Sequence, residues 1–193
     1  GAGAKNAAVT TVAASTEYSY AKGSTCTLAS TSITVNQNAV TLSTYGTGAK
    51  PIIVGNAASY ALTVTTSNGF SVTGLDWRNG VTGAVNLSAT TTGGTFSGNA
   101  INSSVIGLVI SAAGATNITG SGNTTTCTGS ASICWNIATN GGGIAFSDSP
   151  ITLTATDRSS TSLIGVRLSG TATVLNNIDV TGGNMGVEIR TTN

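Results

Sequence analysis

Residues 61–80 read ALTVTTSNGFSVTGLDWRNG, and this stretch contains one structural unit of the chain. It begins with a small, an apolar, a variable and a second apolar residue. A short polar break and another alternating run follow, and the unit ends at a glycine. The four-residue pattern returns at 39–42, 84–87, 107–110, 134–137, 165–168 and 186–189, and in degenerate form at 17–20. Repeats of this length are typical of solenoids, propellers or arrays.

The residue types in the repeats favour stacked β-coils. Apolar and variable residues alternate in each first strand, so one face is expected to be buried and the other wet. No segment keeps a 3.6-residue period, which argues against leucine-rich repeats, and a propeller blade needs about 40 residues. Antiparallel hairpins in a sandwich are the alternative, but they do not require the same residue types to return in the same order. The sequence predicts an all-β parallel β-helix of about seven to eight rungs, with an inward stack of Leu62, Val85, Leu108 and Val166.

The predicted organisation is a single β-helix domain over residues 18–193, preceded by an N-terminal tail or arm over 1–17. This first segment either lies along the first rung or pairs with another subunit. Two rungs are longer than the others, and loop insertions are expected near 124–132 and 151–163. Insertions in solenoids emerge as loops on one face.

Asparagine closes several rungs, and a ladder of inward asparagines is expected at one corner of the coil. Asparagine tolerates the left-handed backbone of a sharp turn, and stacked amides can hydrogen-bond along the axis. The predicted ladder consists of Asn56, Asn79, Asn102 and Asn123.

The cysteines predict one disulfide. Cys127 and Cys134 flank the first insertion, and a bridge between them would close a short loop of the kind that secreted proteins permit. Cys26 is interpreted as the equivalent of Phe70 in a later rung, and is therefore expected to be a buried thiol.

The segment TLSTYGTGAKPII at 41–53 resembles a stretch common near the start of secreted right-handed β-helix proteins. These proteins belong to the pectate-lyase-like superfamily, and with the repeats the resemblance covers roughly residues 18–193. It implies a right-handed coil and a secreted, extracellular or cell-surface location. The superfamily includes polysaccharide lyases, pectin hydrolases, tailspikes, adhesins and non-catalytic structural proteins, so the fold does not select a function.

The sequence contains no recognisable catalytic, metal or cofactor site. The acidic residues include none of the closely spaced Asp pairs that pectin hydrolases use, and histidine is absent. A net charge of +1 disfavours nucleic acid as a partner, and no apolar run is long enough to span a membrane. Arg167 and Glu188 are expected to form an exposed ion pair, and Asp76 and Arg78 a local pair beside Trp77.

Carbohydrate remains a candidate partner, because aromatic faces at turns suit sugar rings. Tyr45, Tyr60 and Trp77 are the candidate contact residues. Among the Asn-x-Ser/Thr sequons, Asn86 and Asn117 are the better candidates for glycosylation, because both are expected to point outward.

The last stretch, GVEIRTTN at 186–193, decides the functional interpretation. Its Val187 and Ile189 are expected to form an inward apolar pair on an unpaired edge, and such an edge invites another chain. We expect this edge to dock by β-strand addition against the N-terminal region of a second copy, near Val9 and Val12. The sequence therefore favours a secreted structural protein, a self-assembling filament or surface-fibre subunit. The alternative is the β-helix portion of a polysaccharide-active enzyme or of a glycan-binding adhesin.

Overall fold

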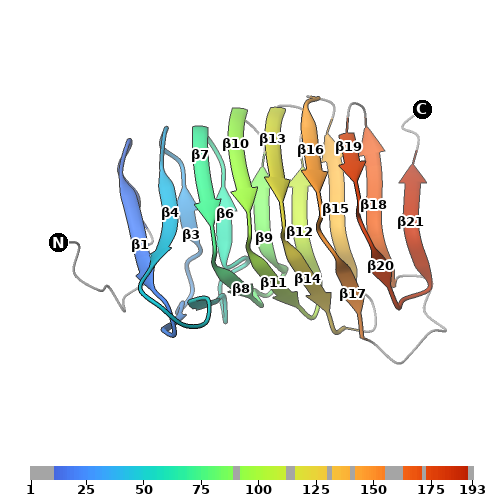
Figure 1. The fold of residues 1–193 in the computed structure, drawn as a ribbon, viewed down its shortest axis with the longest axis horizontal. Coiled ribbons are helices and arrows are strands. Elements are labelled where there is room, and N and C mark those ends of the chain that lie inside the picture. Colours follow the sequence, from blue (N-terminus) through green and yellow to red (C-terminus); the bar gives the residue numbers. More distant parts are fainter. Residues whose placement is uncertain are drawn as a thin grey trace.

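The computed structural model describes residues 11–88, 92–111, 116–129, 132–139, 142–154, 163–170 and 173–190. These parts of the chain wind into a parallel β-solenoid, with β1 at one end and β21 at the other (Figure 1). Each coil contributes one strand to each of three sheets, and all strand pairings among the described residues are parallel. The predicted all-β parallel β-helix is confirmed. Each sheet contains seven strands in the described residues, at the lower bound of the predicted number of rungs.

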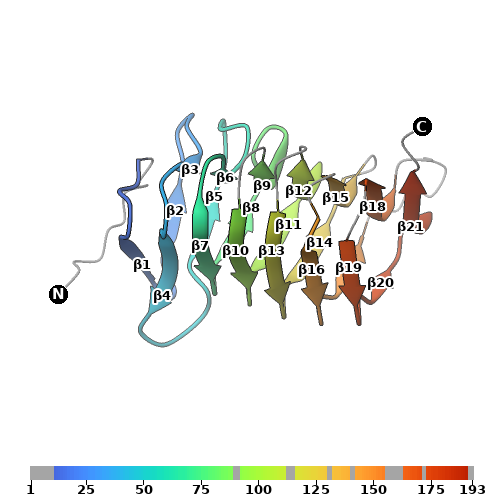
Figure 2. The same cartoon turned by 90° about the horizontal axis from the view of Figure 1, so that it is seen from above.

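The strands run along the solenoid in a regular order, and the view from above shows the same succession of coils (Figure 2). The first sheet contains β1 (Glu17–Ala21), β4 (Thr41–Tyr45), β7 (Asn68–Thr73), β10 (Thr92–Ser97), β13 (Thr116–Ser121), β16 (Ile144–Ser147) and β19 (Thr173–Asn176). The second contains β2 (Thr25–Thr27), β5 (Ile52–Val54), β8 (Asp76–Arg78), β11 (Ala100–Ser103), β14 (Thr124–Cys127), β17 (Ile151–Leu153) and β20 (Val180–Thr181). The third contains β3 (Ile33–Val35), β6 (Leu62–Val64), β9 (Gly83–Ser88), β12 (Ile106–Ser111), β15 (Ile133–Thr139), β18 (Ile164–Gly170) and β21 (Met185–Arg190).

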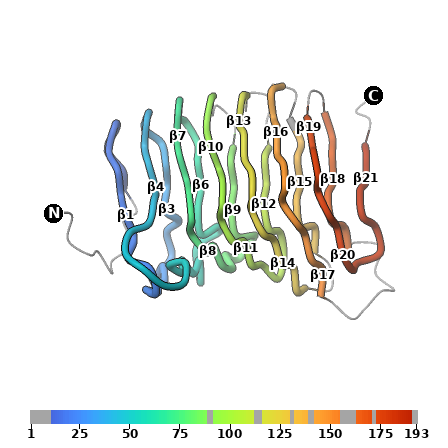
Figure 3. Tube along the Cα trace, viewed as in Figure 1, coloured from blue at the N-terminus to red at the C-terminus, as the bar shows by residue number. Residues whose placement is uncertain are grey.

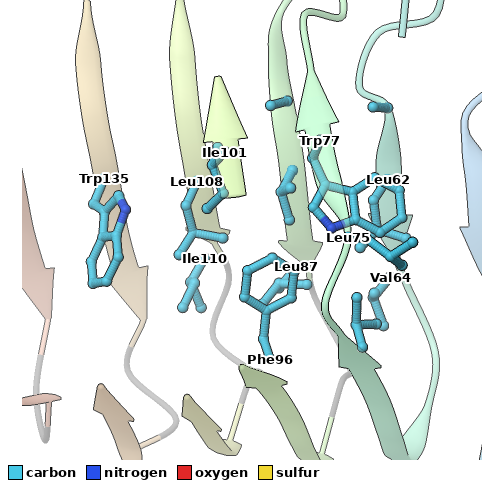
Figure 4. Close-up of a cluster of buried hydrophobic side chains, with 14 of the residues drawn as sticks. Leu62, Val64, Leu75, Trp77, Leu87, Phe96, Ile101, Leu108, Ile110 and Trp135 are labelled. Atoms are coloured by element: carbon cyan, nitrogen blue, oxygen red, sulfur yellow. The ribbon is translucent and has the colours of Figure 1, made fainter. Parts of the chain in front are cut away.

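The third sheet contains the inward stack that the sequence predicted. Register pairs join Leu62 to Val85, Val85 to Leu108, and Leu108 through Trp135 to Val166. All five side chains are completely buried. Figure 4 shows Leu62, Leu108 and Trp135 in the same interior. The stack is confirmed, because alternation along each strand and fixed register between strands place the same pattern position inside in every coil.

The first two copies of the repeat were assigned to the wrong sheet. Residues 17–20 and 39–42 match the sequence pattern, but Tyr18 pairs with Leu42 in the first sheet. The strand beneath Leu62 is instead β3, in which Ile33 pairs with Leu62 and Val35 with Val64. Inward strands of all three sheets share the same alternation, so a short pattern does not identify the sheet.

Cys26 was also aligned with the wrong position. It lies in the second sheet, where Cys26 pairs with Ile53 and Ile53 with Trp77, whereas Phe70 belongs to the first sheet. Its thiol is free and buried, as expected, and burial raises its pKa.

Glycines in the first sheet make room for aromatic rings. A Cβ on Gly94 would lie 2.0 Å from the ring of Phe70, and one on Gly120 would lie 2.4 Å from the ring of Phe146. Gly120 occupies the register position between Phe96 and Phe146 in one inward column. Aromatic residues therefore alternate with glycines along the column, and the rings fill the interior without overpacking it.

The corner between the first and second sheets carries a buried polar ladder built on Asn99 and Asn123. Asn99 Oδ1 accepts hydrogen bonds from the Leu75 amide (3.1 Å) and from Trp77 Nε1 (3.4 Å). Asn123 Oδ1 in turn accepts from the Asn99 amide (3.1 Å) and from Asn99 Nδ2 (3.3 Å). Ser149 continues the ladder by accepting a hydrogen bond from the Asn123 amide at 3.2 Å. From Leu75 to Ser149, the ladder thus connects four successive coils.

The predicted ladder was correct only in Asn123. Asn56 and Asn79 are exposed and follow strands of the second sheet, and Asn102 lies half-buried within β11. Asn56 and Asn79 lie just after strands of the second sheet and Asn102 lies inside one, whereas Asn123 lies immediately before such a strand begins. Asparagines at equal spacing in the sequence therefore need not lie at the same corner, because every coil turns at several places.

The N-terminal segment has structure before the expected first rung. Thr11 pairs in parallel with Thr34 of β3, and Val12 is buried in the core. Of the two expected insertions, residues 124–127 form β14 and 151–153 form β17. Residues 130–131 and 155–162 lie outside the described residues, as do residues 1–10.

The predicted disulfide between Cys127 and Cys134 is present, and it joins the end of β14 to β15 within one coil. Both cysteines are completely buried. The bridge closes a loop with a sequence separation of 7, so it restricts a short part of the unfolded chain.

We expect loss of this bridge to lower the free energy of unfolding by about 2 kcal/mol, the chain-entropy value for so short a loop. The double variant Cys127→Ala/Cys134→Ala tests this by chemical denaturation. The matched control is the single variant Cys26→Ala, which retains the bridge. Equal stability of the double variant and the unmodified protein would contradict the prediction.

Candidate functional site

The three aromatic residues proposed as sugar platforms do not form a common surface. Trp77 is completely buried in the second-sheet column, so its assignment as a glycan contact was wrong. In β8 the flanking Asp76 and Arg78 face the other side of the sheet, and this alternation turns Trp77 inward. Tyr45 is 38% exposed at the end of β4, and Tyr60 is half-buried.

The two candidate glycosylation sites differ in accessibility. Asn117 is exposed and has a left-handed backbone with a φ of 53°. Asn86 lies half-buried on the outer side of β9, and its Oδ1 is buried without a hydrogen-bond partner. Asn117 is therefore the more accessible of the two side chains.

The charged side chains pair locally. Arg78 donates from Nε (3.1 Å) and Nη2 (2.7 Å) to Asp76 Oδ2, and this contact raises the pKa of Arg78. Asn102 Nδ2 also donates to Asp76 Oδ1 at 2.8 Å. Within the described parts of the chain, no three His, Cys, Asp or Glu residues are grouped as metal ligands. The same parts contain no helix suited to crossing a membrane.

A second charged group fixes the last strand from outside. Arg167 Nε donates to Glu188 Oε2 at 2.5 Å, and Arg190 Nε donates to Glu188 Oε1 at 2.8 Å. The pairing of Arg167 with Glu188, expected from their equivalent positions, is confirmed by the register of β18 and β21. Hydrogen bonds from Arg167 and then Arg190 hold the pKa of Glu188 below its ordinary value. The outer side of β21 is thus held against β18 at neutral pH.

The inner side of β21 carries exposed apolar side chains in line with the buried interior. Val187 pairs with Val166 and Ile189 with Leu168, so both continue the inward columns of the third sheet. Val187 is nevertheless 51% exposed and Ile189 is 75% exposed, whereas Val166 is completely buried. β21 is the outermost strand of its sheet among the described residues, and no described coil lies beyond it (Figure 3).

The opposite end of the solenoid is covered. Ile33 and Val35 of β3 are buried although β3 is the outermost strand of its sheet. Val12 packs beside them in the core, and the Ala13 amide donates to the Tyr18 hydroxyl at 2.9 Å. Val12, expected at a contact between copies, is therefore buried within its own chain, and Val9 lies outside the described residues.

The two ends form the candidate site, because they combine an exposed apolar edge with an edge that already holds a parallel β-bridge. Val187 and Ile189 were predicted from the sequence, whereas Tyr18 and Ile33, which belong to the covered end, were not. Their signal was present in the apolar alternation of 33–35, which the misassigned repeat at 39–42 concealed.

Comparison with known proteins gave no match to a protein family, to a curated protein or to a solved structure.

Proposed function

We propose that this protein is a secreted structural subunit that polymerises end to end through the two ends of its β-solenoid. The proposal includes a right-handed coil of the pectate-lyase-like kind, supported by the resemblance of residues 41–53. Assembly of this type joins two different surfaces, and a heterologous contact that does not close on itself gives a filament.

The exposed inner side of β21 is the observation that supports this proposal most directly. Val187 and Ile189 complete columns whose other members are buried, apart from the partly buried Leu168, yet more than half of each residue is exposed. Burying apolar surface contributes about 25 cal/mol per Å², so it would be favourable for another molecule to cover this end. Contiguous apolar surface on a soluble protein marks an interaction site.

A second copy supplies a matching cover. If its β3 extends the third sheet, Ile33 lies beside Val187 and Val35 beside Ile189, which continues both inward columns. In the first sheet, β1 extends β19, and Tyr18 lies over the partly buried Leu175. In the second sheet, β2 extends β20, and Cys26 lies over Val180. The same residue classes that stack within the chain thus meet across the junction.

Composition and the disulfide agree with a role outside the cell. A bridge such as Cys127–Cys134 persists in oxidising compartments. The chain carries only 7% charged residues, so few charges would oppose close packing of identical copies. The junction is accordingly expected to depend little on salt concentration.

The test is assembly of the unmodified protein and of Ile189→Asp, followed by light scattering and negative-stain microscopy. We expect filaments from the unmodified protein and monomers from Ile189→Asp, because a carboxylate at this inward position would be buried unpaired in the junction. Ile189 is 75% exposed in the single subunit, so the variant should still fold.

Val81→Asp is the matched control, since Val81 is 66% exposed and lies between β8 and β9, away from both ends. It should assemble like the unmodified protein. A monomeric unmodified protein at high concentration would refute the proposal, as would filaments of unchanged repeat from Ile189→Asp.

A further inference from the structure

The N-terminal segment occupies the position that end-to-end assembly needs. Thr11 pairs in parallel with Thr34, the central residue of β3. Thr11 is exposed and Val12 buried, so their side chains alternate outward and inward as in a strand of the third sheet. This single parallel bridge lies on the outer edge of β3, so that edge already receives one parallel backbone pairing.

The same edge is the one that β21 of a second copy would use. If all three sheets continue across the junction, Glu188 lies opposite Thr34, in the place of Thr11. Ile189 then lies opposite Val35, in the place of Val12. Two strands cannot occupy one position.

A stack that retained both strands would be discontinuous. The third sheet would gain one strand at the junction, while the first and second sheets would be separated by one additional strand spacing, about 4.8 Å. The inward residues of β19 and β20 would then lose their partners in β1 and β2. Continuous sheets therefore require the N-terminal strand to leave.

The contacts of the two competitors differ in extent. Within its described residues, the N-terminal segment pairs with β3 at Thr11 alone, and its other polar contacts are hydrogen bonds of residues 13–16 to Tyr18, Asn38 and Thr41. β21 runs over residues Met185–Arg190, and it is fixed in its own subunit by pairing with β18 and by the ion pairs of Glu188. Replacement of the short strand by the longer one extends the backbone pairing along β3.

We propose that residues 11–12 form a self-complementing strand, which covers the β3 edge in the free subunit and is displaced by β21 of a second copy. This inference rests on the proposed end-to-end assembly and assigns its regulation. The free subunit keeps its apolar edge covered, and only molecules with the strand displaced can receive another copy. If roughly one molecule in ten is open, the apparent affinity for the next copy falls about tenfold.

A reversible lock tests the displacement. The variant Thr11→Cys/Thr34→Cys places two thiols on directly paired residues, whose separation in a parallel ladder suits a disulfide. The oxidised variant, verified by mass spectrometry, should fail to elongate. The reduced variant should assemble, because its N-terminal strand can leave.

The control Thr63→Cys/Asn86→Cys locks two directly paired residues in the middle of the same sheet. It should assemble in both redox states, which also accounts for any effect of reducing Cys127–Cys134. Equal assembly of the oxidised and reduced Thr11→Cys/Thr34→Cys variant would overturn the displacement and leave end-to-end assembly intact. Failure of the unmodified protein to assemble would overturn both.

A second variant should change the rate of assembly in the opposite direction. Val12→Asp removes the inward anchor of the N-terminal strand and should accelerate assembly about tenfold, by opening the β3 edge in most molecules. Ile189→Asp, by contrast, should abolish assembly. If Val12 instead contributed directly to the junction, Val12→Asp would slow assembly like Ile189→Asp. Circular dichroism of each monomer confirms that the solenoid is retained.

Discussion

Replacing Asn99 with alanine is expected to lower the free energy of unfolding by about 3–5 kcal/mol, because several buried groups lose a hydrogen-bond partner worth about 1–3 kcal/mol each. Asn99 is completely buried at the corner between the first and second sheets. Its Nδ2 donates to the Val72 carbonyl (2.9 Å) and to the Ser97 carbonyl (3.1 Å). Its Oδ1 accepts from Leu75 and from Trp77. A methyl group satisfies none of these partners.

Asn102→Ala is the matched control for this substitution. Asn102 lies in the same coil but is only half-buried, and its side chain donates to Asp76 Oδ1. We expect the control to cost less than about 1 kcal/mol, since water can replace this partner. Urea denaturation compares the two variants, and amide hydrogen exchange at Leu75 reports the corner itself. Equal destabilisation by both substitutions would contradict the prediction that the buried hydrogen bonds of Asn99 contribute more to stability than the contact of Asn102.

The sequence could have indicated this ladder by a longer motif than single asparagines. Residues 97–99 and 121–123 both read Ser-Gly-Asn, and the middle glycines adopt left-handed backbones with φ values of 63° and 62°. At the equivalent place in the next coil, Asp148 has a φ of 49° and precedes Ser149. The column is therefore defined by a left-handed residue followed by a buried polar one. Spacing alone selected Asn56, Asn79 and Asn102, which follow a strand or lie within one rather than precede it.

The inward side chains of the third sheet could be predicted, because side chains alternate along each strand and the register between strands fixes which residues share a face. Once Leu62 points inward, Val85 and Leu108 must do so, since each pairs directly with its neighbour. The same argument placed Arg167 beside Glu188 on the outer face. The start of the chain was less predictable, because Val40 and Leu42 match the pattern equally well from a different sheet. Only the pairing of whole coils distinguishes the sheets.

In the candidate site, too, one part could be predicted from the sequence and another could not. Val187 and Ile189 follow from the repeat, and their inward register was predictable from the last copy. The strand at Thr11 and Val12 was not, because two residues have no detectable period. Its position depends on the free edge of β3, which becomes visible only when all three sheets are assembled.

Trp77→Ala is expected to lower the free energy of unfolding by about 3–5 kcal/mol, because a large completely buried side chain is removed and a cavity remains. Trp77 packs between Ile53 and Ile101 in the second-sheet column. The substitution also removes the hydrogen bond from Trp77 Nε1 to Asn99. Figure 4 shows its ring projecting toward the interior beside Leu75.

The measurement uses the second tryptophan of the chain. Trp135 lies two coils further on and stays in the variant, so its fluorescence follows urea denaturation without the mutated side chain contributing. Tyr45→Ala is the control, because an exposed aromatic at the end of β4 should change stability by no more than about 0.5 kcal/mol. In a solenoid each coil contacts its neighbours, so a shifted Trp135 transition means that the loss at Trp77 is transmitted along the stack. An unchanged Trp135 midpoint, with hydrogen exchange accelerated only in β8 and its neighbours, would contradict cooperative unfolding of the whole solenoid and define coils as separate unfolding units.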